Sequence, residues 1–395
     1  MNLARRELLA AGLGAAALGS GTLASGTLSS GPLSSGAVHA STLPLPQEPD
    51  SAAPKPTPPK PDGWTRREAH ELGLEGRGWD DVAAPYHRLP GRARETVRDA
   101  VWRLSTQTSG MFVTFEAATP ALRFEVDLSE ERLALPHMPA TGASGVDLYA
   151  REGDGPWRWV FCSRPGSQRY AAEVKGLSPT ARTYRLYLPL YNGATSLRVA
   201  VPDGVELTPV RPRTTPPLVY YGTSIAHGAC ASRPGMSFVN ILGRRLDIPV
   251  LNLGFSGNGR LELELAELLG ELDARAFVVD CLPNLNPKGV AERTVPFVRA
   301  LRTRRPDTPI VMVEDRVNAN AAFFPGRARH HEGNHAAFRA AFDELTAAGV
   351  DGLTYVRDMP FLGEDGEATV DGSHPTDLGM VRYADALEPI LRPLV

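Results

Sequence analysis

The sequence predicts two domains, an antiparallel β-sandwich followed by a three-layer α/β/α domain with a five-stranded parallel sheet. Between residues 63 and 213, short apolar runs alternate with polar residues and are separated by Gly, Pro, Asp and Asn, which is typical of a sandwich. From residue 216 onward, short apolar strands alternate with helical patterns, which indicates parallel strands joined by helices. The chain has 395 residues, enough to bury a core in each domain.

The first 40 residues are expected to be an export signal that precedes the fold. Arg5-Arg6 stand before a weakly apolar Ala/Gly-rich run, and residues 38–40 offer a site for signal peptidase. This pattern is typical of twin-arginine export, although a chance arginine pair in a disordered tail also fits. The apolar run is too short and too rich in glycine for stable membrane insertion. Residues 41–62 are rich in proline and are expected to form an extended linker.

The sandwich segment contains short runs that each offer one apolar face, so two packed sheets are expected. The expected strands lie at 100–104, 111–115, 121–126, 146–149, 157–161, 183–187 and 196–201. Trp157 and Trp159 are two residues apart and are expected to share a sheet face. That face fits either a core or domain-interface role or a platform on which a sugar stacks.

The second segment is expected to form a doubly wound sheet whose strand ends carry the functional site. The expected strands are 218–221, 250–253, 277–280, 310–314 and 353–356. The expected helices are 237–246, 261–272, 290–305, 335–348 and about 378–391. Right-handed crossovers bring the carboxyl ends of all these strands to one edge of the sheet, where such folds bind ligands.

Ser224 is the first candidate for chemistry, because it follows Gly222 at the end of the first of these strands. A serine on a glycine turn between a strand and a helix is where an α/β fold presents a nucleophile. Serine in such a turn also serves simply as a helix cap. A serine nucleophile needs a base and a group that orients the base.

Asp371 and His374 can supply the base and its orienting group, because they lie three residues apart on a Gly/Pro-rich loop before the last helix. A tight turn there can aim the carboxylate at one imidazole nitrogen and leave the other for Ser224. The alternative is a solvated loop in which Thr376 or Asp377 caps the last helix.

Acyl transfer also needs hydrogen-bond donors for the oxyanion. Gly257 follows the second strand of this domain, and Asn284 follows the third, so both face the same edge as Ser224. The backbone N–H groups of Ser224 and Gly257 and the side-chain amide of Asn284 are therefore expected to form an oxyanion hole. Glycine after a strand also commonly just turns the chain.

Taken together, these blocks resemble the SGNH (GDSL-like) hydrolase family over about residues 216–395. The matching positions are Gly222-Thr223-Ser224, Gly257, Asn284, and the final Asp371 and His374. Thr223 stands where the family usually has aspartate, and Leu282-Pro283 precede Asn284 where Gly-x is commoner. The resemblance implies a flavodoxin-like α/β/α fold and a serine hydrolase acting on carboxylic esters, with no metal or other cofactor.

A second resemblance concerns the sandwich, whose Gly145-Val-Asp-Leu-Tyr149 is similar to the Gly-x-Asp-Leu-Tyr motif of a domain found ahead of such hydrolases. Residues 229–235 and 252–259 look like the same branch. The resemblance implies an exported esterase that removes acetyl or other small acyl groups, with an acylated carbohydrate or another small ester as substrate. A lipase or thioesterase-like enzyme and a non-catalytic carbohydrate-binding relative remain as alternatives.

Further polar residues lie near the expected site. His227, Glu314 and Arg316 are candidates for substrate binding, although a helix-start histidine and structural ion pairs explain them equally simply. Three histidines cluster at 330, 331 and 335, but no carboxylate spacing in the sequence supports a metal site there.

Composition excludes several partners. The net charge is −3 with both signs mixed, so neither nucleic acid nor an anionic membrane surface is expected as a partner. The 3 cysteines show no paired spacing, which argues against a disulfide scaffold or a cysteine metal site. Cys230 and Cys281 both fall near strand ends and are expected either to form a disulfide or to stay as two free thiols. The oligomeric state is not set by any pattern in the sequence.

Overall fold

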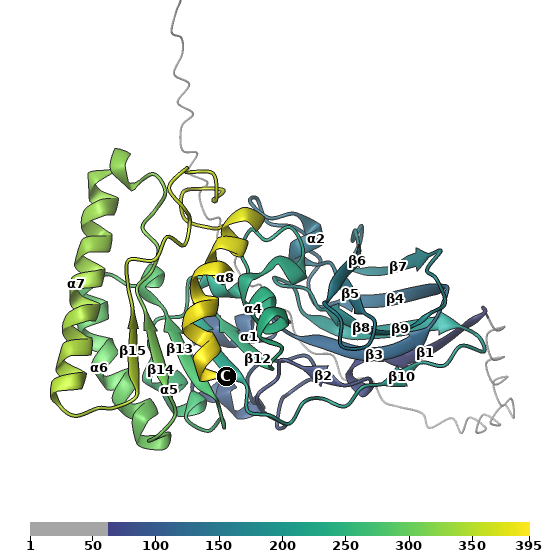
Figure 1. The fold of residues 1–395 in the computed structure, drawn as a ribbon, viewed down its shortest axis with the longest axis horizontal. Helices are drawn as coiled ribbons and strands as arrows, with labels where there is room; N and C mark the ends of the chain where they lie inside the picture. The colour runs from purple at the N-terminus through teal and green to yellow at the C-terminus, as the bar shows by residue number, and fades with distance from the viewer. Residues whose placement is uncertain (1–61) are drawn as a thin grey trace, which may run out of the picture. The chain divides into compact units, whose positions relative to one another are not determined.

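Residues 62–395 are described by the computed structural model, and they contain a β-sandwich followed by an α/β/α domain (Figure 1). The expected export signal and nearly all of the proline-rich linker lie outside the described residues. Within them, no helix combines the length and the apolar character that crossing a bilayer requires.

The sandwich consists of two antiparallel sheets whose inner faces share one apolar core. One sheet has the order β1-β9-β4-β7, and the other has the order β10-β3-β8-β5-β6 with β2 paired to β3. The strands are β1 (Trp64–Glu68), β2 (Leu74–Glu75), β3 (Phe112–Ala118), β4 (Ala121–Leu128), β5 (Asp147–Arg151), β6 (Arg158–Cys162), β7 (Arg169–Lys175), β8 (Ala181–Tyr187), β9 (Ala194–Pro202) and β10 (Thr208–Pro209). Helices α1 (Asp99–Ser105) and α2 (Ala140–Ala143) lie between strands.

One expectation for this segment was wrong. Residues 100–104 form part of α1 rather than a strand, and the buried residues of this helix, Val101 and Ser105, are four apart. A run of five residues is too short to separate a period of 2 from a period of 3.6.

Trp157 and Trp159 contact neighbouring positions of β5, since Trp157 packs against the cluster that contains Tyr149 and Trp159 donates a hydrogen bond to Asp147, but their burial differs. Trp157 is half-buried between the guanidinium groups of Arg151 and Arg185, whereas Trp159 is 52% exposed.

The second domain has the expected five-stranded parallel sheet, in the order β12-β11-β13-β14-β15. Its strands are β11 (Leu218–Gly222), β12 (Val250–Gly254), β13 (Ala276–Asp280), β14 (Ile310–Val313) and β15 (Leu353–Val356). Its helices are α3 (Ser224–His227), α4 (Phe238–Leu246), α5 (Leu263–Leu269), α6 (Pro287–Arg304), α7 (Pro325–Ala347) and α8 (Asp377–Leu391). The strand order reverses between β11 and β13, and ligands bind at such a switch point in this class of fold.

Helices cover both faces of this sheet, which is why its strands are apolar on both sides. Tyr220 and Tyr221 are neighbours on β11 and point to opposite faces. Tyr220 packs against Phe238 of α4 in the core that α4 and α8 cover, and Tyr221 stacks on Phe297 of α6 in the core that α5, α6 and α7 cover. In Figure 1 the α6–α7 layer and the α4–α8 layer lie on either side of the sheet.

Helix α7 begins at Pro325, well before the expected start at 335. Proline is favoured at the first position of a helix, where its missing N–H is not needed. The buried positions of α7 follow a helical spacing throughout, but the first two of them, His331 and Asn334, are polar. The apolar periodicity of the sequence therefore indicates only the second half of the helix.

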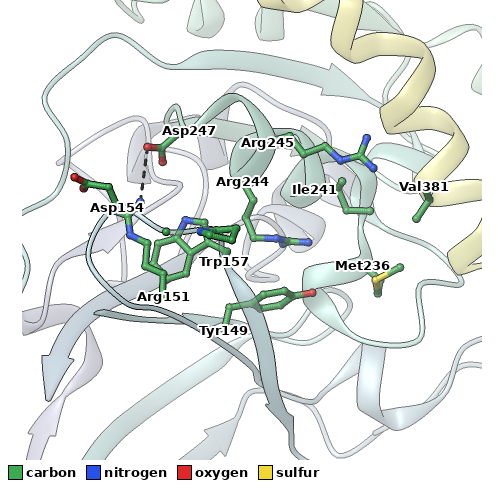
Figure 2. Close-up of a pocket in the computed structure, with 12 residues that line it drawn as sticks. Tyr149, Arg151, Asp154, Trp157, Met236, Ile241, Arg244, Arg245, Asp247 and Val381 are labelled. Carbon is green, nitrogen blue, oxygen red and sulfur yellow. Dashed lines mark ion pairs between the residues drawn. The ribbon is translucent and has the colours of Figure 1, made fainter. Parts of the chain in front are cut away.

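The Gly-x-Asp-Leu-Tyr motif of the sandwich binds the α/β/α domain directly. The carboxylate of Asp147, which is fully buried, accepts hydrogen bonds from Arg233 Nη1 at 2.8 Å and from the backbone N–H of Gly235 at 2.7 Å. Tyr149 accepts a hydrogen bond from Arg233 at 2.6 Å, and its ring lies under the guanidinium of Arg244 (Figure 2). The motif therefore fixes the segment that follows α3.

A second connection between the two domains is made by Arg88, which is buried and has four backbone carbonyls as partners. It donates to the carbonyls of Leu104 and Gln107 at 2.6 and 2.8 Å, and to those of Asn252 and Gly254 on β12 at 2.9 and 3.0 Å. Burial lowers the pKa of Arg88 to about 9. The N-terminal part of the chain thus supports the carboxyl end of β12.

Candidate active site

Ser224 lies where the sequence predicts a nucleophile, immediately after β11 and at the start of α3. Thr223 is the N-cap of this helix, and its hydroxyl accepts a hydrogen bond from the N–H of Ile225 at 3.4 Å. The hydroxyl of Ser224 is therefore not needed as a cap. At Gly222 a Cβ would lie 2.7 Å from the Cβ of Ala226, so the tight turn into α3 requires glycine.

The side chains of Ser224, His374 and Asp371 are linked in this order by two hydrogen bonds. The distance from Ser224 Oγ to His374 Nε2 is 2.8 Å, and the distance from His374 Nδ1 to Asp371 Oδ2 is 2.7 Å. The other carboxylate oxygen of Asp371 accepts the backbone N–H groups of Ser373 and His374 at 2.9 and 2.8 Å. Partial burial raises the pKa of Asp371, but these hydrogen bonds outweigh it and hold the pKa at about 2.

This geometry is that of a serine whose hydroxyl proton can pass to an imidazole held by a carboxylate. With the Asp371 carboxylate accepting from Nδ1, the lone pair of His374 is directed through Nε2 at Ser224 Oγ. The short loop between Asp371 and His374 closes both the side-chain contact and the backbone contact, so the pair forms one local unit. The structure thus brings together the three residues that the sequence predicts to act together.

Gly257 and Asn284 lie on two segments that touch each other at the same edge of the sheet. The loop 255–259 folds back on itself, with the N–H groups of Asn258 and Gly259 donating to the carbonyl of Phe255 at 2.8 and 2.9 Å. Asn284 Nδ2 donates to the carbonyl of Gly259 at 3.2 Å. Gly257 has a φ of 68°, a left-handed conformation that favours glycine.

The same loop is pressed against the turn that carries Ser224. At Gly259 an added Cβ would lie 2.0 Å from the carbonyl oxygen of Gly222. The N–H of Phe255 donates to that carbonyl at 3.0 Å. The backbone around Gly257 therefore adjoins the nucleophile turn, as an oxyanion hole requires, and the donor roles of Gly257 and Asn284 remain predictions.

His227, which the sequence offered as a substrate contact, has a different position. Its side chain is fully buried, its Nε2 lies 2.8 Å from the carbonyl oxygen of Leu190, and its ring stacks on Tyr191 at 4.3 Å between centroids. Burial and the nearby Arg88 hold the pKa of His227 well below its usual range. Because it is neutral and enclosed, His227 supports α3 rather than binding substrate.

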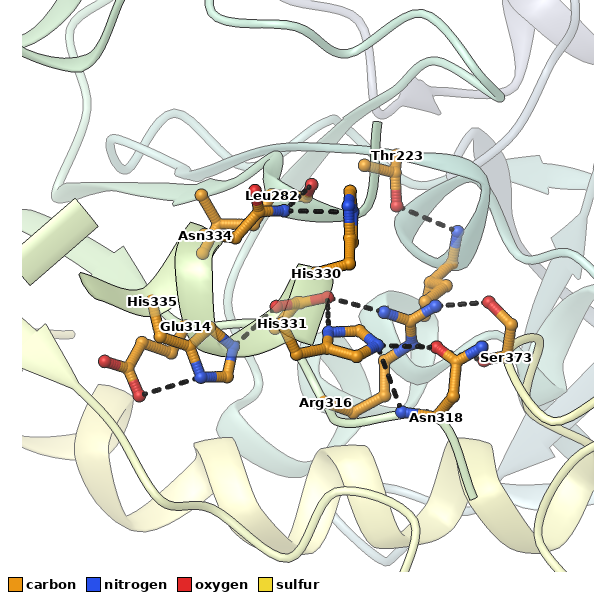
Figure 3. A network of polar contacts seen from close by, with 12 residues as sticks. Thr223, Leu282, Glu314, Arg316, Asn318, His330, His331, Asn334, His335 and Ser373 are labelled. Atoms are coloured by element: carbon orange, nitrogen blue, oxygen red, sulfur yellow. Dashed lines mark hydrogen bonds and ion pairs between the residues drawn. The ribbon is translucent and has the colours of Figure 1, made fainter. Parts of the chain in front are cut away.

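Glu314 and Arg316 are both buried and have different hydrogen-bond partners, so neither is an exposed substrate contact. Glu314 is buried, and its Oε1 accepts from Arg339 Nη2 at 3.0 Å and from the hydroxyl of Tyr355 at 2.7 Å, which are structural contacts. Arg316 is also buried and reaches the loop of His374. Its Nε donates to the carbonyl of Ser373 at 3.3 Å and its Nη2 donates to the Ser373 hydroxyl (Figure 3).

A carboxylate does join the histidine cluster, contrary to the expectation from sequence spacing. Asp315, from the end of β14, lies 2.7 Å from His335 Nε2 and 3.2 Å from His331 Nδ1. Burial raises the pKa of Asp315, but hydrogen bonds from the two histidines and the charge of Arg316 lower it overall. Arg316 Nη1 also donates to Asp315 at 2.7 Å, so the charge that a metal ion would neutralise is already balanced.

The three cysteines, all within residues 62–395, are free. Cys230 and Cys281 are buried, and burial raises the pKa of Cys230 to about 12 and that of Cys281 well above its usual value. Of the two expectations for this pair, the one of two free thiols is confirmed.

His137 was missed by the sequence interpretation. It belongs to the sandwich, on the loop between β4 and α2, and its exposed ring lies 5.5 Å from the ring of His374 at an interplanar angle of 68°. No periodicity or motif marks this loop, which reads only as a polar connection between a strand and a short helix.

Known protein families match both domains of the chain. Residues 215–392 match the model of the GDSL-like lipase/acylhydrolase family, and residues 63–207 match the model GxDLY, the N-terminus of SGNH hydrolase-type esterases. Among curated proteins, no sequence matches the chain.

Solved structures share the whole two-domain arrangement. A crystal structure from Bacteroides ovatus, assigned as a GDSL-like lipase, is 32% identical with a TM-score of 0.81, covering 84% of this chain and 98% of its own. The salicylyl-acyltransferase SsfX3 of a tetracycline biosynthetic pathway is 20% identical with a TM-score of 0.65, covering 85% and 96%. A family two carbohydrate esterase from Cellvibrio japonicus is 13% identical with a TM-score of 0.53, covering 84% and 98%. The last two likenesses concern the fold alone.

The predicted family and the predicted fold class are thereby confirmed. The Bacteroides structure matches both domains at 32% identity, and each domain also matches its own family model. The chain belongs to the GDSL-like lipase/acylhydrolase family, in the branch with a GxDLY N-terminal domain, and is an ester-hydrolysing enzyme of the SGNH type.

Proposed function

We propose that the protein is an exported serine esterase that removes small acyl groups, chiefly acetyl, from carbohydrate. The observation that carries the catalytic part is the line of contacts from Ser224 through His374 to Asp371, with distances of 2.8 and 2.7 Å. A serine held this way at the switch point of a parallel sheet has the base and the orienting group that acyl transfer needs.

In the proposed reaction, His374 Nε2 takes the hydroxyl proton as Ser224 Oγ attacks the ester carbonyl. The resulting oxyanion is stabilised by the N–H groups of Ser224 and Gly257 and by the amide of Asn284. His374 then gives its proton to the departing alcohol oxygen, which leaves an acyl-serine. A water molecule, deprotonated by His374, attacks the acyl-serine and releases the acid and the free serine.

The carbohydrate part of the proposal is supported by a cavity beside the loop 255–259, which contains Gly257. This cavity has a volume of about 470 Å³ and is lined by Ser256 and Asn258 of that loop and by side chains of the sandwich. Half of the sandwich side chains that line it are charged or carry an amide, namely Arg103, Gln107, Glu130 and Arg132. Such a lining can hydrogen-bond the hydroxyls of a sugar and suits an aliphatic alcohol poorly. A carbohydrate esterase is also among the structures that share this fold.

A longer acyl chain is the second candidate, and a specific observation favours it. Phe323 and Phe324, just before α7, are 82% and 47% exposed. They come just before the first turns of α7 in the chain. These turns, together with Arg316 and Ser373, line a cavity of about 280 Å³. Exposed aromatic residues beside a site can bind an apolar chain.

The test is acetate release from a panel of acetylated polysaccharides by the wild type, by Ser224→Ala and by Ser178→Ala. Ser178 is an exposed serine of the sandwich, so its variant controls for the loss of any hydroxyl. Acetate should be released by the wild type and the control and not by Ser224→Ala. Equal release by all three would sink the proposed nucleophile. Rates on p-nitrophenyl acetate and palmitate separate the two candidates, since a small-acyl esterase prefers the acetate.

Export is proposed from the sequence of residues 1–40. Changing Arg5 and Arg6 together to lysine should keep the protein in the cytoplasm of a host with a twin-arginine pathway, because that pathway reads the arginine pair. Cell fractionation with activity assays measures this directly. Unchanged export of the double variant would contradict the twin-arginine assignment.

A further inference from the structure

The loop that carries His137 is a tight turn held by its own backbone. Leu135 and Met138 exchange two hydrogen bonds, at 3.0 and 3.1 Å, so Pro136 and His137 form the two-residue tip between them. Proline at the first tip position fixes one backbone angle of the turn in advance. The direction in which His137 projects is therefore set by the backbone.

The same loop is fastened to the protein at both of its ends. Met138 is 2% exposed and packs in the core that contains Ile225 of α3. At the other end, the side chain of Asn192, fully buried, accepts the N–H of Glu130 at 3.0 Å and donates to the carbonyl of Glu130 at 3.1 Å. Satisfied buried polar groups of this kind make a surface loop rigid.

His137 itself contributes little to this anchoring. Its side chain is exposed, and within residues 62–395 its ring contact is with His374, at 5.5 Å between ring centroids. A histidine that the fold does not need, held on a rigid tip over the proposed catalytic base, is placed to meet the substrate.

The chemistry of the proposed reaction tells which part of the substrate His137 meets. His374 must give its proton to the alcohol oxygen when the ester bond breaks, so the alcohol has to lie against the His374 ring. An exposed side chain in contact with this ring, as His137 is, therefore lies close to the alcohol. Leu135, on the same turn, also lines the 470 Å³ cavity beside the loop 255–259, to which the proposed function assigns the carbohydrate.

We infer that His137 is a specificity-determining residue whose imidazole hydrogen-bonds the alcohol portion of the ester, a polyhydroxylated alcohol such as a sugar. The inference rests on the proposed function in one respect, the role of His374 as the proton donor to the alcohol. The sandwich thus contributes a substrate contact beside a catalytic centre whose serine, histidine and aspartate come from the α/β/α domain.

The experiment compares kcat/KM for esters that share the acetyl group and differ in the alcohol, using a monoacetylated methyl xyloside, glycerol monoacetate and p-nitrophenyl acetate. p-Nitrophenyl butyrate is added to test the acyl side. The variants are His137→Ala, His137→Gln and His137→Phe. His70→Ala is the matched control, because His70 is also an exposed sandwich histidine with an edge-on ring contact, at 6.0 Å, but to Tyr86.

His137→Ala and His137→Phe should lower kcat/KM for the xyloside by about three- to tenfold, the effect of one neutral hydrogen bond. p-Nitrophenyl acetate, which offers no hydroxyl and leaves without help, should change by less than about twofold by the same reasoning. His137→Gln should restore part of the loss, since an amide can donate and accept. The control should behave as the wild type on every ester.

Three results would overturn the inference: no change on any ester, an equal fall on all three, or a changed preference between p-nitrophenyl acetate and butyrate. The second would mean that His137 acts through His374, and the third would place it on the acyl side. A wild type that cleaves glycerol monoacetate but no sugar ester would refute the proposed carbohydrate substrate instead. In that case the ratio of kcat/KM for glycerol monoacetate to kcat/KM for p-nitrophenyl acetate in the variants still decides the role of His137.

Discussion

Arg316 holds Ser373 by two hydrogen bonds, one to its carbonyl at 3.3 Å and one to its hydroxyl, and so joins the end of β14 to the loop of His374. Arg316 also donates a hydrogen bond to the carboxylate of Asp315, and the other oxygen of this carboxylate is hydrogen-bonded to His335. The position of the proposed base therefore depends on a buried charge network that touches neither Ser224 nor Asp371.

Ser373→Ala should lower kcat on p-nitrophenyl acetate by roughly three- to tenfold, because one acceptor of Arg316 is lost and the loop gains freedom. KM should change by less than about twofold, since no substrate contact is removed. Ser373→Thr keeps the hydroxyl and should recover most of kcat. A fall confined to KM, or no recovery with threonine, would refute a positioning role.

Asp371→Asn should lower kcat/KM by about 10⁴-fold, because an amide at this position favours the wrong imidazole tautomer. The folded protein should keep its circular dichroism spectrum. The carboxylate of the wild type stays ionised down to about pH 2, the pKa of Asp371, so loss of activity at mildly acidic pH reports another group. A tenfold loss or less would show that Asp371 does not orient His374.

Asp280 lies buried at the end of β13, where it accepts a hydrogen bond from Tyr220 at 2.8 Å, and burial raises its pKa to about 7. Because the folded state keeps this proton and the unfolded state releases it near 3.8, stability should fall as the pH rises towards 7. Asp280→Asn removes this penalty. At pH 8 it should be more stable than the wild type by about 2–4 kcal/mol, with a gap that closes near pH 4.

Urea denaturation at several pH values measures this gap. Asp154→Asn, at an exposed carboxylate of the sandwich, is the control for the loss of a carboxylate at the surface. A gap that stays constant with pH would mean that Asp280 is not protonated in the folded state at neutral pH.

Arg88→Met should destabilise the protein by about 3–5 kcal/mol, because four carbonyls inside the protein each lose a hydrogen bond. Arg94→Met, at an exposed arginine of the same segment, should change stability by less than about 0.5 kcal/mol. The midpoint of urea unfolding compares the two. If both variants lost the same small amount, Arg88 would not be the support that its contacts indicate.

Residues of the α/β/α site could be predicted from the sequence because they follow strands. Ser224, Gly257 and Asn284 each come shortly after a buried apolar run, and parallel strands bring their ends to one edge. Asp371 and His374 could be added because a carboxylate and an imidazole three residues apart make one local unit. In each case a short stretch of sequence was enough to place the residue.

Other features could not be predicted because they depend on contacts between distant segments. His137 reaches His374 only through the docking of the sandwich, and no local pattern encodes that docking. His331 and Asn334 are polar residues on the buried face of α7, so hydrophobic periodicity missed the first half of that helix. His227 was a candidate for substrate binding, with a helix-start residue as the alternative, and it is enclosed by Leu190 and Tyr191 of the other domain.

Ser109 shows what the domain boundary means for the folding of the chain. Its hydroxyl donates to the carbonyl of His227 at the end of α3 at 2.7 Å, while Arg88 serves the carbonyls at the end of β12. A chain cut near residue 214 would carry every catalytic group and still lose the donors that these backbone positions need. The α/β/α domain is thus not expected to fold without the sandwich. Mutations in the sandwich should therefore lower activity by reducing the yield of folded protein as well as by removing substrate contacts.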